Sequence, residues 1–497
     1  MAKKTINKEL TGAQDLYNFL FEACNIIRGP VSQDNFKDYI TPLLYYKRIS
    51  DVYDEETEEA LISSGGDKEY ASLPEQHRFV IPDGCHWQEV RERTENLGAA
   101  IVGAMRQIEI ANPDTLYGVL SMFSSQKWTN KAILNDSKIR DLIEHLSKRK
   151  LGNKDYPADL MGDAYEILLK KFADDSKAQA GEFYTPRSVV RLLVHILDPQ
   201  PGETVYDPAC GSGGMLIEAI RYMHDDSLCC GSIFGQEKNV VNAAIAKMNL
   251  FLHGASDFNV MQGDTLRDPK ILQGGNIAKF DCVIANPPFS LENWGATEWS
   301  SDKYKRNIYG TPSDSCGDYA WIQHMICSMS SGKGRMAVVM PQGILFRGNQ
   351  EAEIRKQLVE SNLIEAVVTL GDKLFYGTGL SPCFLIIRRM KPAHHSGRIL
   401  MIDGSKILTQ KRAQNILEEN DIDRLYSLYQ NYSDEEDYSR IVTLQEIRDK
   451  EYNLSPNRYV VYHKEKIRPY AEVLAEFKHA YEEVKRLEEE FSLLINA

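Results

Sequence analysis

The chain has 497 residues, which is too long for one hydrophobic core and predicts roughly two to four domains. Hydrophobic residues make up 43% and charged residues 26%, a balance that excludes wholesale disorder and fibrous classes. The chain carries 58 basic and 71 acidic residues, and its net charge of -13 predicts weak binding of nucleic acid by the chain alone.

The apolar segments are too short to cross a membrane, because a spanning helix needs about 20 consecutive apolar residues. The first residues, Met1 to Leu10, are polar and contain lysines, so we expect no signal peptide and a cytoplasmic protein. The nine cysteines form no CxxC pair and the eleven histidines form no HExxH, so we expect reduced thiols and no metal site.

Residues 1–155 predict a helical domain. Apolar side chains recur three or four positions apart from Leu16 to Ile27, and the pattern continues from Phe36 to Leu44. No alternating strand pattern appears before residue 150. The front of the chain is therefore expected to contain helices and loops only.

Residues 156–410 predict a second domain, in which short β-branched runs alternate with helical stretches. The predicted strands are Thr204–Asp207, Ser232–Phe234, Phe258–Met261, Phe280–Ala285, Arg335–Met340, Ile364–Leu370 and Cys383–Ile387. Apolar strands separated by helices are typical of α/β proteins, in which helices cover both faces of a parallel sheet.

Residues 411–497 predict a charged helical region. In its last helix, from Lys466 to Asn496, apolar residues form two rows seven apart: Tyr470, Phe477, Val484 and Phe491, and Val473, Ala480, Leu487 and Leu494. This seam fits either a helix that folds back on its own domain or a helix that packs against a partner subunit. We favour the partner, because the seam is terminal and has charged flanks.

A glycine-rich turn, Asp207–Gly214, follows the first predicted strand and precedes a helix. Its candidate binding residues are Asp207, Gly211, Ser212, Gly213 and Gly214. Glycines let the backbone turn tightly and approach a ligand closely, although tight strand-to-helix turns need glycine in any case. Leu216 stands where a dinucleotide fingerprint has its third glycine, which argues against NAD.

Two acidic residues follow the next two strands. Glu237 is placed to accept hydrogen bonds from both hydroxyls of a ribose, or to cap the following helix. Asp264 is placed to accept from the amino group of an adenine, or to cap a helix in the same way. Together with the glycine-rich turn, they favour a nucleoside ligand with unmodified hydroxyls.

The most informative segment is Asn286-Pro287-Pro288-Phe289, which directly follows a buried strand. The two prolines hold the backbone extended and rigid. The amide oxygen of Asn286 and the carbonyl of Pro287 then become fixed acceptors beside the ring of Phe289, an arrangement that suits a planar base with an exocyclic amine. Accepting hydrogen bonds from both N–H groups of that amine frees its lone pair. The alternative is a proline turn whose Phe fills the core.

A further segment, Gly181–Arg187, lies just ahead of the first helix of the second domain. Its candidate residues are Glu182, Phe183, Tyr184, Thr185, Pro186 and Arg187. Polar groups at a helix N-terminus suit a carboxylate, or else Thr185 acts as an ordinary helix cap.

In this order, the turn Asp207–Gly214, Glu237 and Asn286–Phe289 resemble the S-adenosylmethionine-dependent amino-methyltransferases. Segment Gly181–Arg187 resembles the group that methylates N6 of adenine in DNA. With the segments Asp38–Asp51 and Tyr452–Tyr459, the chain resembles the modification subunit of type I restriction–modification systems along nearly its whole length.

This resemblance implies a Rossmann-like methyltransferase sheet with an N-terminal helical domain and a C-terminal helical tail. It implies that Glu182–Arg187 and Ser212–Gly214 surround the methionine half of S-adenosylmethionine, while Glu237 holds its ribose and Asp264 faces its adenine. It implies that Asn286–Phe289 hold a target adenine flipped out of the duplex, because N6 cannot be reached inside the stack. No metal is implied.

The implied partners are a specificity subunit, a restriction subunit and double-stranded DNA. Because the chain has no GxxxxGK[ST], any ATP-driven translocation is assigned to another subunit. Asn-Pro-Pro with an aromatic residue also occurs in methyltransferases that act on RNA or on a protein glutamine, but these seldom have the helical front and tail. A non-catalytic scaffold that binds the cofactor is a further alternative, against which the intact Asn286–Phe289 argues.

Overall fold

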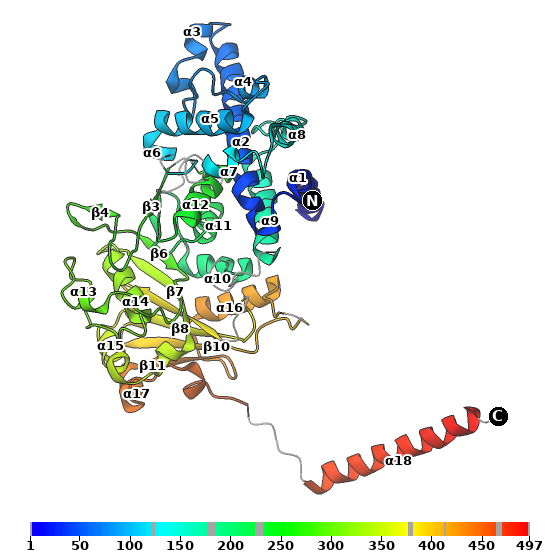
Figure 1. Ribbon diagram of the computed structural model, residues 1–497. Coiled ribbons are helices and arrows are strands. Elements are labelled where there is room, and N and C mark those ends of the chain that lie inside the picture. Colours follow the sequence, from blue (N-terminus) through cyan, green and yellow to red (C-terminus); the bar gives the residue numbers. More distant parts are fainter. Residues whose placement is uncertain are drawn as a thin grey trace.

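The computed structural model describes residues 2–116, 118–120, 125–175, 185–223, 232–255, 257–375, 381–411, 414–463 and 470–495 (Figure 1). The N-terminal helices are α1 (Ala2–Ile27), α2 (Phe36–Ser63), α3 (Lys68–Ala71), α4 (Trp87–Arg91), α5 (Leu97–Ala111), α6 (Pro113–Leu116), α7 (Ser125–Thr129), α8 (Asp136–Leu146) and α9 (Ala158–Asp175), with 3-10 turns at Gln33–Asn35 and Pro74–Gln76. Within the described ranges, the first strand begins only at Val205, which confirms the helical front.

A mostly parallel sheet forms the second part of the molecule. Its strands are β1 (Val205–Asp207), β2 (Ile233–Glu237), β3 (Phe258–Gln262), β6 (Cys282–Ala285), β7 (Arg335–Pro341), β8 (Ile364–Leu370), β9 (Pro382–Arg388), β10 (Arg398–Gly404) and β11 (Ser439–Thr443). They lie in the order β11-β10-β8-β9-β7-β6-β1-β2-β3. Only β9, against β7 and β8, and β11, against β10, run antiparallel to their neighbours. A separate small hairpin joins β4 (Leu272–Gln273) and β5 (Asn276–Ile277).

Helices cover both faces of the sheet, which confirms the expected α/β architecture. One face packs against α10 (Arg187–Leu197), α11 (Gly214–Met223), α12 (Val240–Leu252) and α16 (Glu419–Asn431). The other packs against α13 (Ala296–Ser300), α14 (Asp318–Ser328), α15 (Asn349–Glu360) and α17 (Leu444–Asp449). Along β6, Cys282 and Ile284 join the first core and Val283 and Ala285 the second, so the strand is apolar at every position.

Helix α12 connects the two parts of the molecule. Its Met248 and Phe251 belong to the core of the N-terminal helices, whereas its Ala246 and Leu250 belong to the core beside the sheet. Helix α9 also packs in the N-terminal core, through residues such as Tyr165. The helical domain therefore continues past the expected boundary at residue 155.

The sheet likewise continues past the expected boundary at residue 410. Strand β11 pairs with β10 from Thr443, opposite Arg398, to Ser439, and α16 packs on the same core as α10. A purely helical region from residue 411 onward is therefore incorrect. The sequence signal is weak here because β11 is a five-residue edge strand with mixed burial, so it shows no clear alternation.

The C-terminal helix α18 (Tyr470–Ile495) forms the predicted tail and projects away from the body of the molecule (Figure 1). Its apolar seam is exposed: Val473, Phe477, Val484, Leu487 and Phe491 are between 44% and 66% accessible. Within the part of the chain that the structure describes, the seam does not fold back on its own domain. No helix in that part is both long enough and apolar enough to cross a membrane.

The strand order reverses beside β1. The chain runs from β1 to β2 and β3 on one side, and later returns to β6 on the other side of β1. In open α/β sheets, ligands bind outside the carboxyl ends of the strands at such a point. The turn Asp207–Gly214 follows β1 and the segment Asn286–Phe289 follows β6, so both predicted elements flank this crevice.

Close packing of α9 on α12 provides a stability test. A Cβ added at Gly162 of α9 would overlap the ring of His253, which is buried at the end of α12. We therefore expect Gly162→Ala to lower the free energy of unfolding by about 1–3 kcal/mol, through overpacking. Gly103 of α5 is exposed and has open space around it, so Gly103→Ala is the matched control and should stabilise by about 1 kcal/mol. Denaturant unfolding of both variants checks this, and equal effects would contradict it.

Candidate active site

In the glycine-rich turn after β1, Gly211 and Ser212 are half-buried and Gly214 is exposed. Gly211 has φ +54° and Gly213 has φ +85°, in the left-handed region where glycine is favoured. A Cβ placed on Gly211 or Gly214 would meet nothing within 4 Å. The glycines therefore serve the backbone conformation and leave space in which a ligand can approach the backbone closely.

Two side chains that the sequence did not single out hold this turn in place. Asn249 of α12 donates from Nδ2 to the carbonyl of Ser212 at 3.0 Å. Thr265, after β3, donates from its hydroxyl to the carbonyl of Pro208 at 2.6 Å. A sequence signal existed for Asn249, because it is a polar residue within the apolar run of α12, but nothing local marked Thr265.

Glu237 ends β2 with its carboxylate directed at the glycine-rich turn. Oε2 accepts from the N–H of Gly211 at 3.0 Å, and Oε1 accepts from the N–H of Asn239 at 2.7 Å. Burial raises the pKa of this carboxyl, although backbone N–H groups oppose the shift. Each oxygen keeps a further lone pair, so Glu237 still has acceptor capacity for ligand hydroxyls.

Asp207, at the end of β1, is buried close to Glu237. Its Oδ1 accepts from the N–H of Ala209 at 2.9 Å. Burial raises the pKa of Asp207 to about 8, and the charge of Glu237 adds to the increase. Two carboxyl groups in one poorly solvated place favour a ligand that carries positive charge.

Asp264 precedes a turn at residues 265–267 and not a helix, so the helix-cap alternative for it is wrong. Its Oδ1 accepts from the N–H of Arg267 at 3.3 Å, and its Oδ2 lies 2.9 Å from the ammonium of Lys238. Its carboxylate, just after β3, is therefore already engaged by groups of this chain.

The side chain of Asn286 is oriented by one hydrogen bond. Its Nδ2 donates to the hydroxyl of Thr185 at 2.8 Å. Its Oδ1 is buried and has no hydrogen-bond partner among the described residues. Leaving such an acceptor unpaired costs roughly 1–3 kcal/mol, so this oxygen is placed to accept from a ligand donor.

Phe289, three residues after Asn286, belongs to an aromatic pair. The ring of the half-buried Phe289 is 6.5 Å from that of Phe375, centroid to centroid, with the planes inclined at 52°. Phe375 follows β8 and was missed in the sequence, because a lone Phe in a loop has no distinguishing pattern. Two inclined rings at the carboxyl edge form an apolar wall suited to a planar group.

Only part of the predicted segment Gly181–Arg187 lies within the described residues, which resume at Thr185. Pro186, rather than Thr185, occupies the N-cap position of α10, so Thr185 is not the cap. The guanidinium of Arg187 lies 3.0 Å from Asp163 and 3.5 Å from Glu166, both in α9. Arg187 therefore ties the helical domain to the start of α10.

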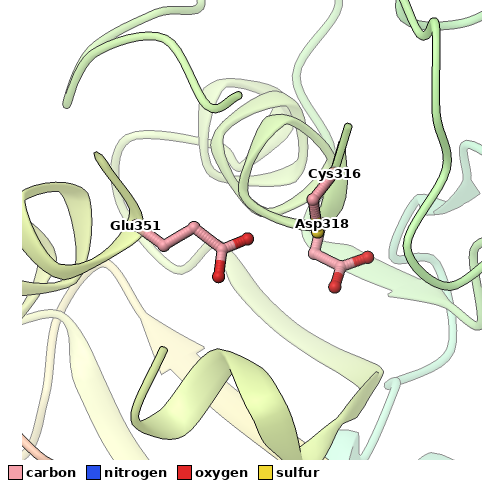
Figure 2. A group of neighbouring side chains, drawn as sticks. All are labelled: Cys316, Asp318 and Glu351. Atoms are coloured by element: carbon pink, nitrogen blue, oxygen red, sulfur yellow. The ribbon is translucent and has the colours of Figure 1, made fainter. Parts of the chain in front are cut away.

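Figure 2 shows Cys316, Asp318 and Glu351, whose ligand atoms lie close enough together to hold a metal ion. The guanidinium of Arg347 already occupies this place. Its Nη1 lies 2.8 Å from Asp318 Oδ2, 3.2 Å from Glu351 Oε1 and 3.0 Å from Cys316 Sγ. Because Arg347 pairs with both carboxylates, the cluster is an ion network around one guanidinium.

The sheet, the turn after β1, the acidic end of β2 and the Asn-Pro-Pro-Phe segment after β6 together define an S-adenosylmethionine-dependent amino-methyltransferase. Residues 156–467 match the family model for N-6 DNA methylases, and residues 16–146 match the HsdM N-terminal domain. The chain therefore belongs to the N-6 DNA methylases, as the modification subunit of a type I restriction–modification system, and transfers methyl groups to N6 of adenine in DNA.

Known proteins support this assignment along most of the chain. The chain is 35% identical over 439 residues to the type I restriction enzyme MjaVII methylase subunit of Methanocaldococcus jannaschii, covering 84% of this chain and 73% of that one. It is 31% identical over 360 residues to the HindI methylase subunit of Haemophilus influenzae, covering 70% and 76%. The crystal structure of a type I methyltransferase subunit from Streptococcus thermophilus superposes with a TM-score of 0.77 at 26% identity, covering 91% and 100%.

The buried Asp207 predicts a difference in pH dependence. Its folded-state pKa of about 8 lies above the ordinary value of about 4 in an unfolded chain, so the folded protein holds a proton that the unfolded chain releases. The resulting stability is fully present below about pH 4 and is lost as pH rises toward 8. Asparagine does not titrate. We therefore expect the thermal midpoint of Asp207→Asn to rise relative to that of wild type as the pH increases from about 4 to 8.

Thermal melts from pH 5 to 9 without added ligand measure this difference. The exposed Asp449→Asn is the matched control, and its midpoint should follow that of wild type with a constant offset. Parallel curves for Asp207→Asn and wild type would show that Asp207 is ionised in the folded protein.

Proposed function

We propose that the crevice at the reversal point binds S-adenosylmethionine beside the turn Asp207–Gly214 and a target adenine beside Asn286–Phe289. The observation that carries this proposal is the buried, unpaired Oδ1 of Asn286, which stands on a proline-stiffened segment. The cofactor, when bound, supplies a methyl group on a positively charged sulfur.

The residues around the turn fit this cofactor. The open space beside Gly211 and Gly214 admits its methionine half. The segment Glu182–Arg187 is assigned to the same half of the cofactor. Glu237 has lone pairs left for the ribose hydroxyls, and its carboxyl group and that of Asp207 favour a cation. Asp264 is assigned to the adenine of the cofactor, whose amino group would compete with the ammonium of Lys238.

The residues after β6 fit the amino group of adenine. Asn286 Oδ1 and the carbonyl of Pro287 accept hydrogen bonds from its two N–H groups, while Pro288 keeps the backbone extended. Withdrawing both hydrogens from the plane of the base frees the lone pair of N6 to form a bond to the methyl carbon as the bond from that carbon to sulfur breaks. The bonding electrons stay with the sulfur, and N6 then releases one of its two protons to solvent. Phe289 and Phe375 pack against the flipped base, which has left its stack in the duplex.

We assign a specificity subunit, a restriction subunit and double-stranded DNA as the partners of this chain. The net charge of -13 opposes attraction to phosphates, so base recognition requires another chain. The exposed apolar seam of α18 supports helix-to-helix packing with that chain.

Two substitutions separate the two halves of the site. Asn286→Ala removes the acceptor for N6, so we expect methylation to fall by at least about 100-fold, as for loss of one preorganised polar contact at a reacting group. Binding of S-adenosylmethionine should stay close to the wild-type value. Glu237→Ala should instead weaken cofactor binding by roughly 1–3 kcal/mol, because its buried partners are left unpaired.

Tritiated methyl transfer to unmodified DNA, by the chain with its specificity subunit, measures the first effect. Isothermal titration with S-adenosylmethionine measures the second. If Asn286→Ala weakened cofactor binding as much as methylation, the amide would belong to the cofactor half of the site. If Glu237→Ala left the dissociation constant unchanged, Glu237 would serve only to hold the N–H groups of Gly211 and Asn239.

Removal of the tail tests the assigned partner. Truncation before Lys466 should abolish co-purification with the specificity subunit and DNA methylation, while cofactor binding persists because the sheet is intact. Phe477→Glu within the seam should act in the same direction, and Lys478→Glu, adjacent but outside the seam, is its matched control. Full methylation by the truncated chain would contradict this role of α18.

A further inference from the structure

The segment Asn286–Phe289 ends at a strained residue. Ser290 has φ +51°, in the left-handed region that costs a non-glycine residue roughly 1–3 kcal/mol unless its surroundings hold it there. Its N–H donates to Oδ1 of Asp318 at 2.7 Å. Asp318 is the first residue of α14, and its side chain is completely buried. A fixed carboxylate therefore holds the backbone immediately after the proposed adenine-binding residues.

Arg347 extends this contact into a network. It follows β7 and the 3-10 turn Gln342–Leu345, and its Nη1 donates to the other oxygen of Asp318 at 2.8 Å and to Glu351 of α15 at 3.2 Å. Its Nη2 donates to the hydroxyl of Ser290 at 3.4 Å. Burial alone would lower the pKa of Arg347, but the hydrogen bond to Asp318 and the charges of Glu351 and Asp318 raise it.

The network contacts the Ser290 end of the segment, which is the end away from Asn286. Asn286 itself is held by Thr185, ahead of α10, whereas Ser290 is held from α14 and from the loop after β7. An ion pair with a buried carboxylate contributes little net stability, since the cost of desolvation offsets most of the attraction. Its geometric effect is clearer, because both ends of a four-residue segment are fixed from different elements.

We propose that Asp318 and Arg347 are positioning residues for methyl transfer, which fix the Ser290 end of Asn286–Phe289 relative to the cofactor. This inference rests on the proposed role of Asn286–Phe289. Neither residue needs to touch the adenine. A displacement of about 1 Å at reacting groups costs on the order of 100-fold in rate, so loosening one end of the segment lowers turnover while the cofactor still binds.

The test uses the full chain with its specificity subunit, tritiated S-adenosylmethionine and unmodified DNA. We expect Asp318→Asn to lower kcat by at least 10-fold, with the dissociation constant of S-adenosylmethionine within about twofold of wild type. Arg347→Ala should do the same, and Arg347→Lys should recover part of kcat because it keeps a cation beside Asp318. The KM for the cofactor should stay close to that of wild type throughout.

Glu203→Gln is the matched control. Glu203 also pairs a buried carboxylate with an arginine, Arg335, at 2.6 Å, but at the amino end of β1 and β7, away from the crevice. It should lower thermal stability without lowering kcat at a temperature where all variants are folded. If Asp318→Asn fails to fold, the comparison of Arg347→Ala with Arg347→Lys decides.

Equal kcat for the Asp318, Arg347 and Glu203 variants would overturn the inference, as would a loss of cofactor binding in proportion to kcat. Asn286→Ala in the same assay distinguishes failure of the positioning role from failure of the proposed role of Asn286–Phe289. If that variant remained active, the proposed role of the segment would fail. If it were inactive while the Asp318 and Arg347 variants kept full activity, only the positioning role would fail.

Discussion

The hydrogen bond from Asn286 Nδ2 to the hydroxyl of Thr185 leaves the buried Oδ1 of Asn286 as the unpaired end of the amide. A side-chain amide has a donor end and an acceptor end, and rotating it by half a turn would exchange them. Because Thr185 engages the donor end, the buried oxygen is the end that remains for a ligand. The opposite orientation would set two donors against an amino group, which is also a donor.

This bond joins two segments that are about one hundred residues apart in the sequence. They meet because β1 and β6 are parallel neighbours and α10 packs across the same region of the sheet. The parallel arrangement brings the carboxyl ends of β1, β2 and β6 to one edge. The turn at this edge is further held by Asn249 and Thr265, so the site depends on contacts from several elements.

The sequence predicted the parts of this arrangement that depend on local residue patterns. All seven predicted strands are present, because each is a short apolar run with its own local pattern. The turn Asp207–Gly214 and the segment Asn286–Phe289 lie where expected, since glycine and proline fix the backbone locally. Their assignment to cofactor and adenine remains a proposal.

The features that were missed depend on tertiary contacts. Strand β11 is short and lies at the edge, so its pairing with β10 determines its conformation more than its own residues do. Asp318 and Arg347 are ordinary charged residues in the sequence, and only the fold brings them to Ser290. The same holds for Phe375 beside Phe289, and for Lys238 beside Asp264.

The charge distribution separates the two binding tasks of the protein. The raised pKa of the carboxyl groups of Asp207 and Glu237 means that positive charge is favoured beside the turn, either as a bound proton or as a cationic cofactor. The overall charge of -13 likewise opposes attraction between the whole chain and the phosphates of DNA. In the proposed assembly the chain therefore contributes the chemistry and the cofactor, while a partner held through α18 brings the DNA to the crevice. The cost of this division is an exposed apolar seam on α18, which only a partner helix would cover.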